Sequence, residues 1–429
     1  MRAARTGAVP VVATVTTVAV VTLGVGLVGL VASLRLSPPA DLGRWGPAAL
    51  SGEAVLALAD RADGVLVGTT NSLLHLAADG TVVDLGVPGP VRALAEHPEG
   101  TFVGTDDGLL DLPDAPVGRA ARSSRPVLSA AAVSDVHVAE DPDGQEVVVL
   151  GTATGVLART GADGWEKLWP PGAADPVPVP AVLAITGGVL FAHPDGLALL
   201  GPTGRLEVVL RDVAVVELHD DARAGLLWAG TRGGPLLLAS DDGGRTWRPR
   251  ADGLGLSAVE TLVRPPGDGG PLLVGGSGLA DGNGNAGTES STDRGLTWQT
   301  EQDRLSNTHV YDLLARREPW RLEARLLGTD SRLGLPLPVS TTRLYAGTNG
   351  GGVSTRRPAV PVLEALVPAA PVLRLLEPLL AGALLLVCLL PAYRHLWRGS
   401  AATPRPPPAA AAPPTDVRAT PHPNHEEIR

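Results

Sequence analysis

The chain repeats one pattern of apolar and polar positions between residues 41 and 360. Each copy starts with an apolar stretch of the type V-x-x-L and passes through a turn into a second apolar stretch that ends in a small pair such as Gly-Thr. Two to four polar or glycine residues and a third apolar stretch follow. Alternation over four to six residues, interrupted by glycine and proline, predicts short β-strands and disfavours helical repeats.

Seven copies align on a small residue at the end of the second stretch. These anchor residues are Gly68, Gly104, Gly151, Ala192, Gly230, Gly275 and Gly347, with spacings of 36, 47, 41, 38, 45 and 72 residues. A period near 40 residues with three or four short strands per copy is typical of one blade of a β-propeller. The sequence therefore predicts an all-β fold, a seven-bladed β-propeller over residues 41–360.

The ends of this repeat array carry two further predictions. The last spacing is long because residues 316–342 interrupt the seventh copy between its first two strands, which predicts an inserted loop. Residues 43–58 resemble the junction between two copies at 245–262, so we expect the strand around Trp45 to be the outer strand of the last blade. Pairing the first and last strands would remove an open sheet edge.

Two apolar segments flank the repeats. Residues 7–34 contain no charged residue and are long enough to cross a bilayer, so we predict a transmembrane helix over 8–34 after a cytoplasmic N-terminus at 1–7, with a signal peptide as the alternative. Residues 378–393 predict a second transmembrane helix, with a helix lying on the membrane surface as the alternative. Residues 361–377 form a linker between the propeller and this second segment.

The residues after the second apolar segment fix the expected orientation. Residues 394–429 are rich in proline and alanine, which predicts a disordered tail. Arg394, Arg398 and Arg405 follow the segment directly, and basic residues favour the cytoplasmic side. We therefore expect both ends in the cytoplasm and the propeller on the extracytoplasmic side of the cell membrane.

Composition and charge narrow the possible partners and cofactors. The formal net charge is −10 and Lys167 is the only lysine, so a nucleic-acid partner is not expected. Cys388 is the only cysteine, which excludes an intramolecular disulfide and cysteine-based zinc or iron-sulfur sites. The histidines are scattered without metal-ligand spacing. We expect no metal, no cofactor and a monomeric propeller.

One eight-residue frame, S-x-D-x-G-x-T-W, occurs at 240–247 and again at 291–298. Its fixed positions are Ser240, Asp242, Gly244, Thr246 and Trp247, and Ser291, Asp293, Gly295, Thr297 and Trp298. The Ser and Asp side chains can hydrogen-bond to backbone N–H groups a few residues on, glycine supplies unusual dihedral angles, and tryptophan buries a large area. We therefore predict tight turns rather than metal or catalytic loops, with the two tryptophans packed between blades.

This frame, together with the repeat, resembles the BNR or Asp-box repeat family of β-propellers, which includes sialidase-like enzymes and photosystem-assembly-factor-like propellers. The resemblance covers about three quarters of the chain. It implies that each box joins the third and fourth strands of a blade at the periphery, away from the active face of those members that are enzymes. The boxes are thus expected to be structural.

Two groups of residues are candidates for binding. Polar residues of the predicted inner strands can line the central channel or its mouth: Arg92, His137, Glu217, Glu260, Tyr311 and Asp312. The alternative for these is blade packing with solvated ends. The inserted loop combines arginines with an aromatic residue, as protein interfaces often do, in Arg316, Arg317, Trp320 and Arg321. The alternative for the loop is an irregular surface excursion.

The sequence supports a binding function better than catalysis. A sialidase-like site needs several converging arginines and a Tyr nucleophile with a Glu partner, and of three tyrosines Tyr311 alone is suitably placed. No G-x-S-x-G motif is present for a serine hydrolase. We predict a membrane-anchored extracytoplasmic β-propeller that binds a protein or glycan partner without catalysis, with an extracytoplasmic glycoside hydrolase as the alternative.

Overall fold

The computed structural model describes the repeat region of the chain. The described residues are 34–36, 43–46, 49–115, 124–129, 131–161, 163–172, 175–266, 270–277, 287–301, 304–305, 307, 309–326 and 332–357, without the side chains of 34–36 and 319–340. The chain divides into two units, residues 35–369 and a second unit of residues 1–34 and 370–429. The two predicted membrane segments, the linker and the tail lie outside the described residues, except for Leu34. The described part of the chain contains no helix with the length and apolarity needed to cross a bilayer.

Every regular element of the described residues is a β-strand. Four sheets contain four consecutive strands each: β2 (Val55–Arg61) to β5 (Val82–Pro88), β6 (Val91–His97) to β9 (Arg125–Ser129), β10 (Val133–Glu140) to β13 (Glu166–Trp169), and β14 (Val182–Ile185) to β17 (Leu206–Arg211). Their middle strands are β3 (Gly64–Thr69), β4 (Ser72–Ala77), β7 (Gly100–Thr105), β8 (Gly108–Pro113), β11 (Glu146–Thr152), β12 (Gly155–Thr160), β15 (Gly188–His193) and β16 (Gly196–Leu200).

The following eight strands form two groups of four, joined by the single residue pair Arg232–Ala258. The first group is β18 (Ala214–Asp221), β19 (Leu226–Arg232), β20 (Leu237–Ser240) and β21 (Arg248–Pro249). The second is β22 (Ala258–Val263), β23 (Leu272–Ser277), β24 (Thr288–Ser291) and β25 (Gln299–Thr300). A last sheet has the order β1 (Leu34–Leu36), β26 (Val310–Leu326), β27 (Arg332–Thr348) and β28 (Gly352–Arg356).

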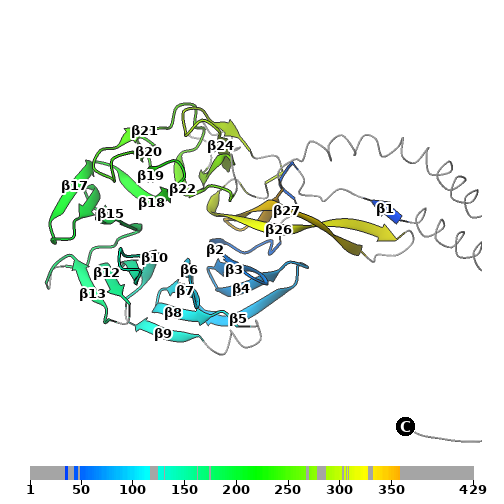
Figure 1. The fold of residues 1–429 in the computed structure, drawn as a ribbon, viewed down its shortest axis with the longest axis horizontal. Coiled ribbons are helices and arrows are strands. Elements are labelled where there is room, and N and C mark those ends of the chain that lie inside the picture. Colours follow the sequence, from blue (N-terminus) through cyan, green and yellow to red (C-terminus); the bar gives the residue numbers. More distant parts are fainter. Residues whose placement is uncertain are drawn as a thin grey trace, which may run out of the picture. The chain divides into compact units, whose positions relative to one another are not determined.

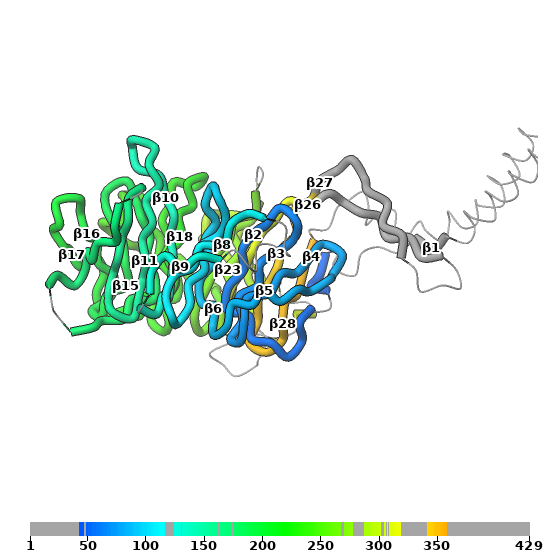
Figure 2. Tube along the Cα trace, turned by 90° about the horizontal axis from the view of Figure 1, so that it is seen from below, coloured from blue at the N-terminus to red at the C-terminus, as the bar shows by residue number. Residues whose placement is uncertain are grey.

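The sheets follow one another around a common centre, with strands such as β2, β6, β10, β18 and β22 on the inner side of their sheets (Figure 1). Seen from the side, they lie next to each other in one layer (Figure 2). Consecutive strands within each sheet pair antiparallel, as in β2 with β3 and β3 with β4. The predicted all-β fold is confirmed, and the arrangement is that of a β-propeller.

The segment around Trp45 closes the last sheet, as the repeat pattern predicts. Ala49 and Val353 exchange two backbone hydrogen bonds of 2.8 Å, and Gly46 N donates to Thr355 O at 2.7 Å. The Trp45 side chain is fully buried, and its Nε1 donates to the backbone oxygen of Glu301 at 2.5 Å. Chain segments from the two ends of the repeat array therefore share one sheet, which leaves no open edge between them.

The anchor residues of the repeat pack against the next sheet. A Cβ atom at each anchor glycine would lie between 2.5 and 2.9 Å from an atom of a valine in the following sheet, closer than real Cβ contacts allow. The glycine–valine pairs are Gly68–Val91, Gly104–Val133, Gly151–Val179, Gly230–Val259, Gly275–Val310 and Gly347–Val55. The last pair joins the final sheet to the first. The second strand of one sheet thus approaches the start of the next inner strand so closely that glycine is required by space rather than by backbone conformation.

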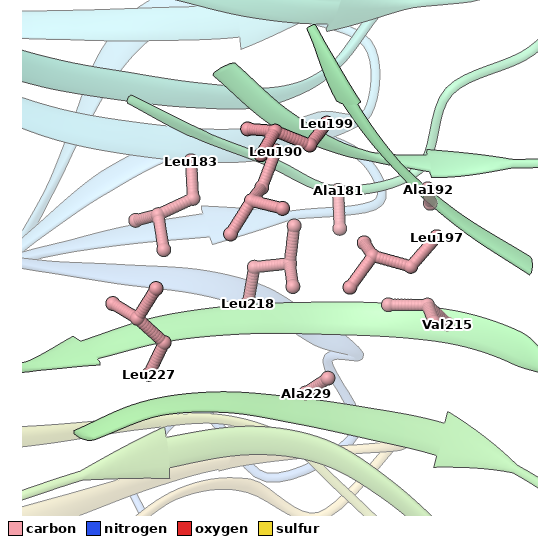
Figure 3. Close-up of a cluster of buried hydrophobic side chains, with 10 residues drawn as sticks. All are labelled: Ala181, Leu183, Leu190, Ala192, Leu197, Leu199, Val215, Leu218, Leu227 and Ala229. Atoms are coloured by element: carbon pink, nitrogen blue, oxygen red, sulfur yellow. The ribbon is translucent and has the colours of Figure 1, made fainter. Parts of the chain in front are cut away.

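Ala192 is the one anchor that carries a Cβ. It lies in a core cluster with Val215 between the sheet of β14–β17 and the sheet of β18–β21 (Figure 3). Four leucines of the cluster, Leu183, Leu190, Leu197 and Leu199, come from the first of these sheets, and Leu218 and Leu227 come from the second. Similar clusters of aliphatic side chains lie between the other pairs of sheets. The core is therefore distributed between sheets, as a chain poor in aromatic residues requires.

The insertion at 316–342 is located as predicted, between the first two strands of its sheet, but it is not a loop. Strands β26 and β27 are each 17 residues long and continue as one antiparallel hairpin beyond the blade. Register pairs run from Val310–Thr348 at the centre of the molecule to Arg325–Arg332 near the tip. Alternating residues such as Leu322, Ala324, Leu333 and Leu335 favour continued pairing over an irregular excursion.

Candidate binding face

The antiparallel topology gives the propeller two faces. Each inner strand begins on one of them, near Val55, Val91, Val133, Val182, Val215, Val259 or Val310, and we call this the start face. The turns between second and third strands lie on the same face, because the second strand runs back toward it. On the opposite face, which we call the hairpin face, first strands turn into second strands. The β26–β27 hairpin and the S-x-D-x-G-x-T-W turns belong to the hairpin face.

A polar cluster on the start face combines residues of three successive sheets. Arg232, at the end of β19, donates from Nε to Glu260 Oε1 at 3.0 Å and from Nη2 to Glu260 Oε2 at 2.8 Å. Ser277, at the end of β23, lies 3.5 Å from Glu260 Oε1 and 3.2 Å from His309 Nε2. The His309 and Tyr311 rings lie 4.5 Å apart. We call Arg232, Glu260, Ser277, His309 and Tyr311 the start-face cluster.

The electrostatics of this cluster are those of a fixed, partly solvated ion pair. The Arg232 side chain is 60% exposed, whereas that of Glu260 is 8% exposed. The hydrogen bonds to Glu260 raise the pKa of Arg232, with a smaller contribution from Tyr311. Burial lowers the pKa of His309, which is therefore neutral at pH 7. The cluster presents one exposed guanidinium, one neutral imidazole and one phenol to solvent.

Arg92 lies on the same face in another sheet. Its Nε donates to Asp106 Oδ1 at 2.6 Å, and both side chains are 46% exposed. The hydrogen bond to Asp106 raises the pKa of Arg92. Arg92 therefore does not join the start-face cluster, but it forms a similar exposed ion pair that provides a natural comparison for it.

The remaining predicted channel residues lie deeper and bridge neighbouring inner strands. Asp312 Oδ2 accepts a 2.6 Å hydrogen bond from Leu58 N in the first sheet. Glu217 accepts a hydrogen bond from Leu262 N in the next sheet. Asp135, which the sequence reading missed, accepts from Val182 N at 2.8 Å. Inner strands leave one row of N–H groups unpaired toward the centre, and these carboxylates supply acceptors for that edge.

Each bridging residue stands two positions after the valine that begins its inner strand. Between the valine and the bridging residue, the register with the second strand of the sheet shifts by one residue or is irregular. This occurs in β10, β18, β22 and β26. Thr261 occupies the same place in β22 and accepts from Leu313 N at 3.2 Å. In the first and second sheets the equivalent residues are Ala57 and Ala93, which carry no acceptor. The position relative to the valine could have predicted the bridging role, because the repeat aligns it directly.

The carboxylates at the centre are close enough to influence one another. Burial raises the pKa of Asp135 and of Asp312 to about 6, although each accepts backbone hydrogen bonds that act in the opposite direction. Burial and the charges of Asp135 and Asp312 raise the pKa of Glu217 well above its usual value. All three keep some exposure to solvent. Water therefore reaches the centre of the molecule. The raised pKa values of the three carboxylates mean that the protein disfavours three negative charges together there.

His137 also takes part in an inter-sheet bridge. Its Nδ1 accepts from Ala184 N at 3.3 Å, and burial lowers its pKa to about 4, with His219 adding to the effect. His137 is thus a neutral acceptor at pH 7. It extends the row of bridges seen at Asp135 rather than contributing a titrating group at physiological pH.

The two S-x-D-x-G-x-T-W turns have nearly identical hydrogen bonds. In the first, Asp242 Oδ1 accepts from the backbone N of Arg245 and of Thr246, at 3.0 and 2.9 Å, and Oδ2 accepts from Thr246 Oγ1 at 2.6 Å. Ser240 Oγ accepts from Gly244 N at 2.9 Å. In the second turn Ser291, Asp293, Gly295 and Thr297 repeat these contacts at the same positions.

The Ser and Asp side chains of these turns are hydrogen-bonded within the turn, and each turn packs on the preceding sheet. The bonds to Thr297 lower the pKa of Asp293 to about 2, and the equivalent bonds to Thr246 lower that of Asp242 further. A Cβ at Gly244 would lie 2.8 Å from Leu190, and one at Gly295 would lie 2.7 Å from Trp228. Trp247 and Trp298 pack against core clusters that span two sheets. The geometry is that of a turn held in place and not of an open site.

Arg316 is engaged within the propeller. Its Nη1 and Nη2 donate to the backbone oxygens of Gly64 and Ala62 at 2.6 and 3.2 Å, and its Nε lies 2.8 Å from Asp60 Oδ1. These contacts tie the base of the hairpin to the first sheet. Arg317 is exposed. Trp320 and Arg321 lie on β26, where the side chains are outside the described set.

A small cavity of about 180 Å³ on the hairpin face lies beside these contacts. Its charged or titratable lining residues are Asp60, Arg61, Glu96, His97 and Asp114. Glu96 Oε1 accepts from Asp60 N at 2.8 Å, and Arg61 pairs with Asp63 and Asp114. Burial raises the pKa of Asp60 and of Glu96. Its polar groups serve mainly to join the first two sheets.

Two observations concern metal binding and acid–base chemistry. Within the described ranges, no three His, Cys, Asp or Glu side chains are grouped as metal ligands. Both oxygens of Glu260 are bound by Arg232, so this carboxylate is not free to act on Tyr311. The sequence reading found Glu260 and Tyr311 but missed Arg232, Ser277 and His309. A signal for these residues was present in the sequence, because polar residues such as Arg232 follow the small pair that ends each second strand.

No family model matches the chain, and no curated protein matches it. Among solved structures, it is similar to the extracellular domain of a hybrid two-component system from B. thetaiotaomicron, with 15% identity, a TM-score of 0.49, and coverage of 73% of this chain and 40% of that one. The match thus spans less than half of that protein's length.

Two other structures cover a similar share of the chain. YCF48 bound to D1 peptide has 13% identity and a TM-score of 0.47, with 74% of this chain and 96% of that one covered. The GH74 enzyme of Niastella koreensis has 13% identity and a TM-score of 0.48, with 73% and 55% covered. At these identities the likeness concerns the fold alone, and with TM-scores below 0.5 none of the three carries an argument about activity or partners.

Proposed function

We propose that this protein is a seven-bladed β-propeller of the BNR type that binds a protein or glycan partner without catalysis. The start-face cluster is its binding site in this proposal. We further propose that the segments at 8–34 and 378–393 hold the propeller at the extracytoplasmic side of the cell membrane. The residues between these segments form one domain with both ends joined in one sheet, which suits attachment at two points.

The observation that carries the binding proposal is the Arg232–Glu260 pair within a cluster drawn from three sheets. The pair is fixed by two hydrogen bonds, so the guanidinium is positioned in advance, while 60% of the Arg232 side chain remains exposed. A rigid arginine beside an aromatic ring is a frequent anchor in protein interfaces. Tyr311 and His309 supply that aromatic surface, and Ser277 adds a hydroxyl.

The test uses the full chain with a photo-crosslinking amino acid at position 311. Cells that express this form are irradiated, and the crosslinked products are compared with those from the same probe at Val82, an exposed residue of β5. We expect a defined product from position 311 that is lost in Arg232→Ala and retained in Arg92→Ala. Arg92→Ala is the matched control because it removes an exposed arginine ion pair from the same face.

Two results would overturn the binding proposal. Identical crosslinks from positions 311 and 82, unaffected by Arg232→Ala, would show that the start-face cluster binds nothing specific. Hydrolysis of a glycoside by the purified chain, abolished by Tyr311→Phe, would establish the hydrolase alternative instead. The same panel of glycans, immobilised and tested for retention of the chain, separates a glycan partner from a protein partner.

A further inference from the structure

The turn between β27 and β28 contains an Asn-Gly pair on the start face. β27 ends at Thr348 and β28 begins at Gly352, so residues 349–351 form the loop between them. Asn349 and Gly350 are both exposed. Among the asparagines that the structure describes, Asn349 is the only one followed by glycine. The binding function proposed above makes no use of this pair.

An asparagine that precedes glycine can lose its side-chain amide without an enzyme. The glycine backbone N attacks the asparagine Cγ, the new C–N bond closes a succinimide ring, and the Cγ–Nδ2 bond breaks to release ammonia. The proton of the glycine N–H passes through solvent to the leaving nitrogen. Water then adds to either ring carbonyl and opens the ring, which gives aspartate or isoaspartate. The reaction consumes one water, releases one ammonia and needs no oxidant or reductant.

The structure leaves both reacting groups of this pair available. Within the described part of the chain, the Asn349 side chain makes no hydrogen bond and the Gly350 N–H donates none. Gly350 has a φ of +77°, and no atom lies within 4 Å of the place that its Cβ would occupy. Glycine itself presents no Cβ to hinder the attack. The nitrogen can therefore approach the Asn349 Cγ without breaking a hydrogen bond or displacing a neighbour.

Asn71, at the turn between the second and third strands of the first sheet, has the opposite arrangement. It is exposed as well, but its Nδ2 donates to Glu53 Oε2 at 2.9 Å. The N–H of the next residue, Ser72, donates to Thr69 Oγ1 at 3.0 Å. Both the side chain and the potential attacking nitrogen are held, and the following residue carries a Cβ. Asn71 should therefore react far more slowly than Asn349.

The loop at Asn349 adjoins the start-face cluster. Asn349 N donates to His309 O at 3.0 Å. Asn307 connects the same two residues, because its Oδ1 accepts from His309 N at 2.9 Å and its Nδ2 donates to Asn349 O. A carboxylate at position 349 would thus add a negative charge to the loop that contacts His309. Isoaspartate would also add one backbone atom to this loop, where Gly350 O accepts from Gly52 N at 3.0 Å.

We propose that Asn349 is a site of spontaneous deamidation, through which the start face gains a negative charge as the protein ages. The reaction needs only water and the Asn349–Gly350 pair. It does not rest on the binding function proposed above, and its test requires no partner.

The test follows the purified full chain over time in mildly alkaline buffer. Trypsin cleavage after Arg343 and Arg356 releases residues 344–356, in which Asn349 is the only asparagine. Mass spectrometry with electron-transfer fragmentation distinguishes asparagine, aspartate and isoaspartate in this peptide. Asn71 in the same samples is the matched control. Asn283 also precedes glycine but lies outside the described residues, and its separate peptide reports whether the conditions permit deamidation.

We expect Asn349 to convert to aspartate and isoaspartate while Asn71 stays intact. Conversion should be faster at higher pH, because the attacking nitrogen must lose its proton. In Gly350→Ala the added Cβ hinders the attack, and the rate at Asn349 should fall about tenfold, which corresponds to about 1.4 kcal/mol in activation free energy. Equal rates at Asn349 and Asn71 would overturn the proposal. An unchanged Asn349 in samples where Asn283 has converted would overturn it as well.

Discussion

Two groups of carboxylates in this protein have opposite pKa shifts. Asp242 and Asp293 are surface residues whose ionised forms accept several hydrogen bonds, which lowers their pKa. Asp135, Glu217 and Asp312 lie at the centre, where burial raises the pKa despite backbone hydrogen bonds. The sequence shows both groups only as acidic residues, because the difference arises from what surrounds each carboxylate.

The first prediction concerns the pH dependence of a turn. Since the folded pKa of Asp293 is about 2, below its ordinary value of 3.8, its contribution to stability is present above about pH 4 and is lost as the pH falls toward 2. Asp293→Asn should therefore lower the melting temperature at pH 7. The difference from the unmodified chain should shrink below pH 4, as measured by circular dichroism. A constant difference down to pH 2 would contradict the role of the charge.

The second prediction concerns the central carboxylates. The folded pKa of Asp312 is about 6, above its ordinary value of 3.8, so the stabilising effect of the bound proton is present at low pH and is lost as the pH rises toward 6. Between pH 4 and 6 one such group changes the unfolding free energy by at most about 1.4 kcal/mol per pH unit, and partial solvation reduces this.

Asp312→Asn removes that titration and should flatten the decline in stability between pH 4 and 6. Urea denaturation at several pH values measures the slope directly. Glu207→Gln, at an exposed position of β17, provides a comparison at a site remote from the centre. An unchanged slope in Asp312→Asn would show that the carboxylate titrates normally.

At the scale of elements, the repeat in the sequence reflects contacts between neighbouring sheets. The anchor glycines were visible as a pattern, and the structure explains them by the valine of the next inner strand. Ala192 marks the one interface where a methyl group is accommodated. Alternation alone predicted strands correctly, but it could not show that the insertion continues β26 and β27.

The third prediction tests one of the two closest of these contacts. In Gly347→Ala, the new methyl group would lie 2.5 Å from Val55 Cγ1, so the sheets on either side must separate. Overpacking of this kind usually destabilises by about 1–3 kcal/mol. Gly187→Ala is the control, because no atom lies within 4 Å of its Cβ position. Equal unfolding free energies for the two variants would contradict the packing explanation.

At the scale of the whole molecule, the ring is held where its two ends meet. Gly46 and Ala49 hydrogen-bond to β28, and the fully buried Trp45 packs with Leu273, Val310 and Leu344. These contacts join residues more than 200 positions apart in the sequence. Contacts between residues so far apart in the sequence form slowly, because a long stretch of chain must close before they can be made.

The fourth prediction follows from this closure. Trp45→Ala should reduce the unfolding free energy by about 3–5 kcal/mol, the range for a buried tryptophan, and should expose the edge of β28. Trp247→Ala is the comparison, since Trp247 is only partly buried at a turn and its loss should be smaller. Denaturant unfolding of the full chain measures both. A larger loss for Trp247→Ala would place the critical contact elsewhere.

The sequence by itself determined the strands, the repeat, the closure around Trp45 and the nature of the S-x-D-x-G-x-T-W turns, because each depends on periodicity or on contacts within a few residues. It also placed Glu260 and Tyr311 among the binding candidates, because they fall at aligned positions of the repeat. Only the tertiary structure brought Arg232, Ser277 and His309 to them. Those contacts link three sheets, and a side chain's partner across a sheet boundary depends on how closely the sheets pack.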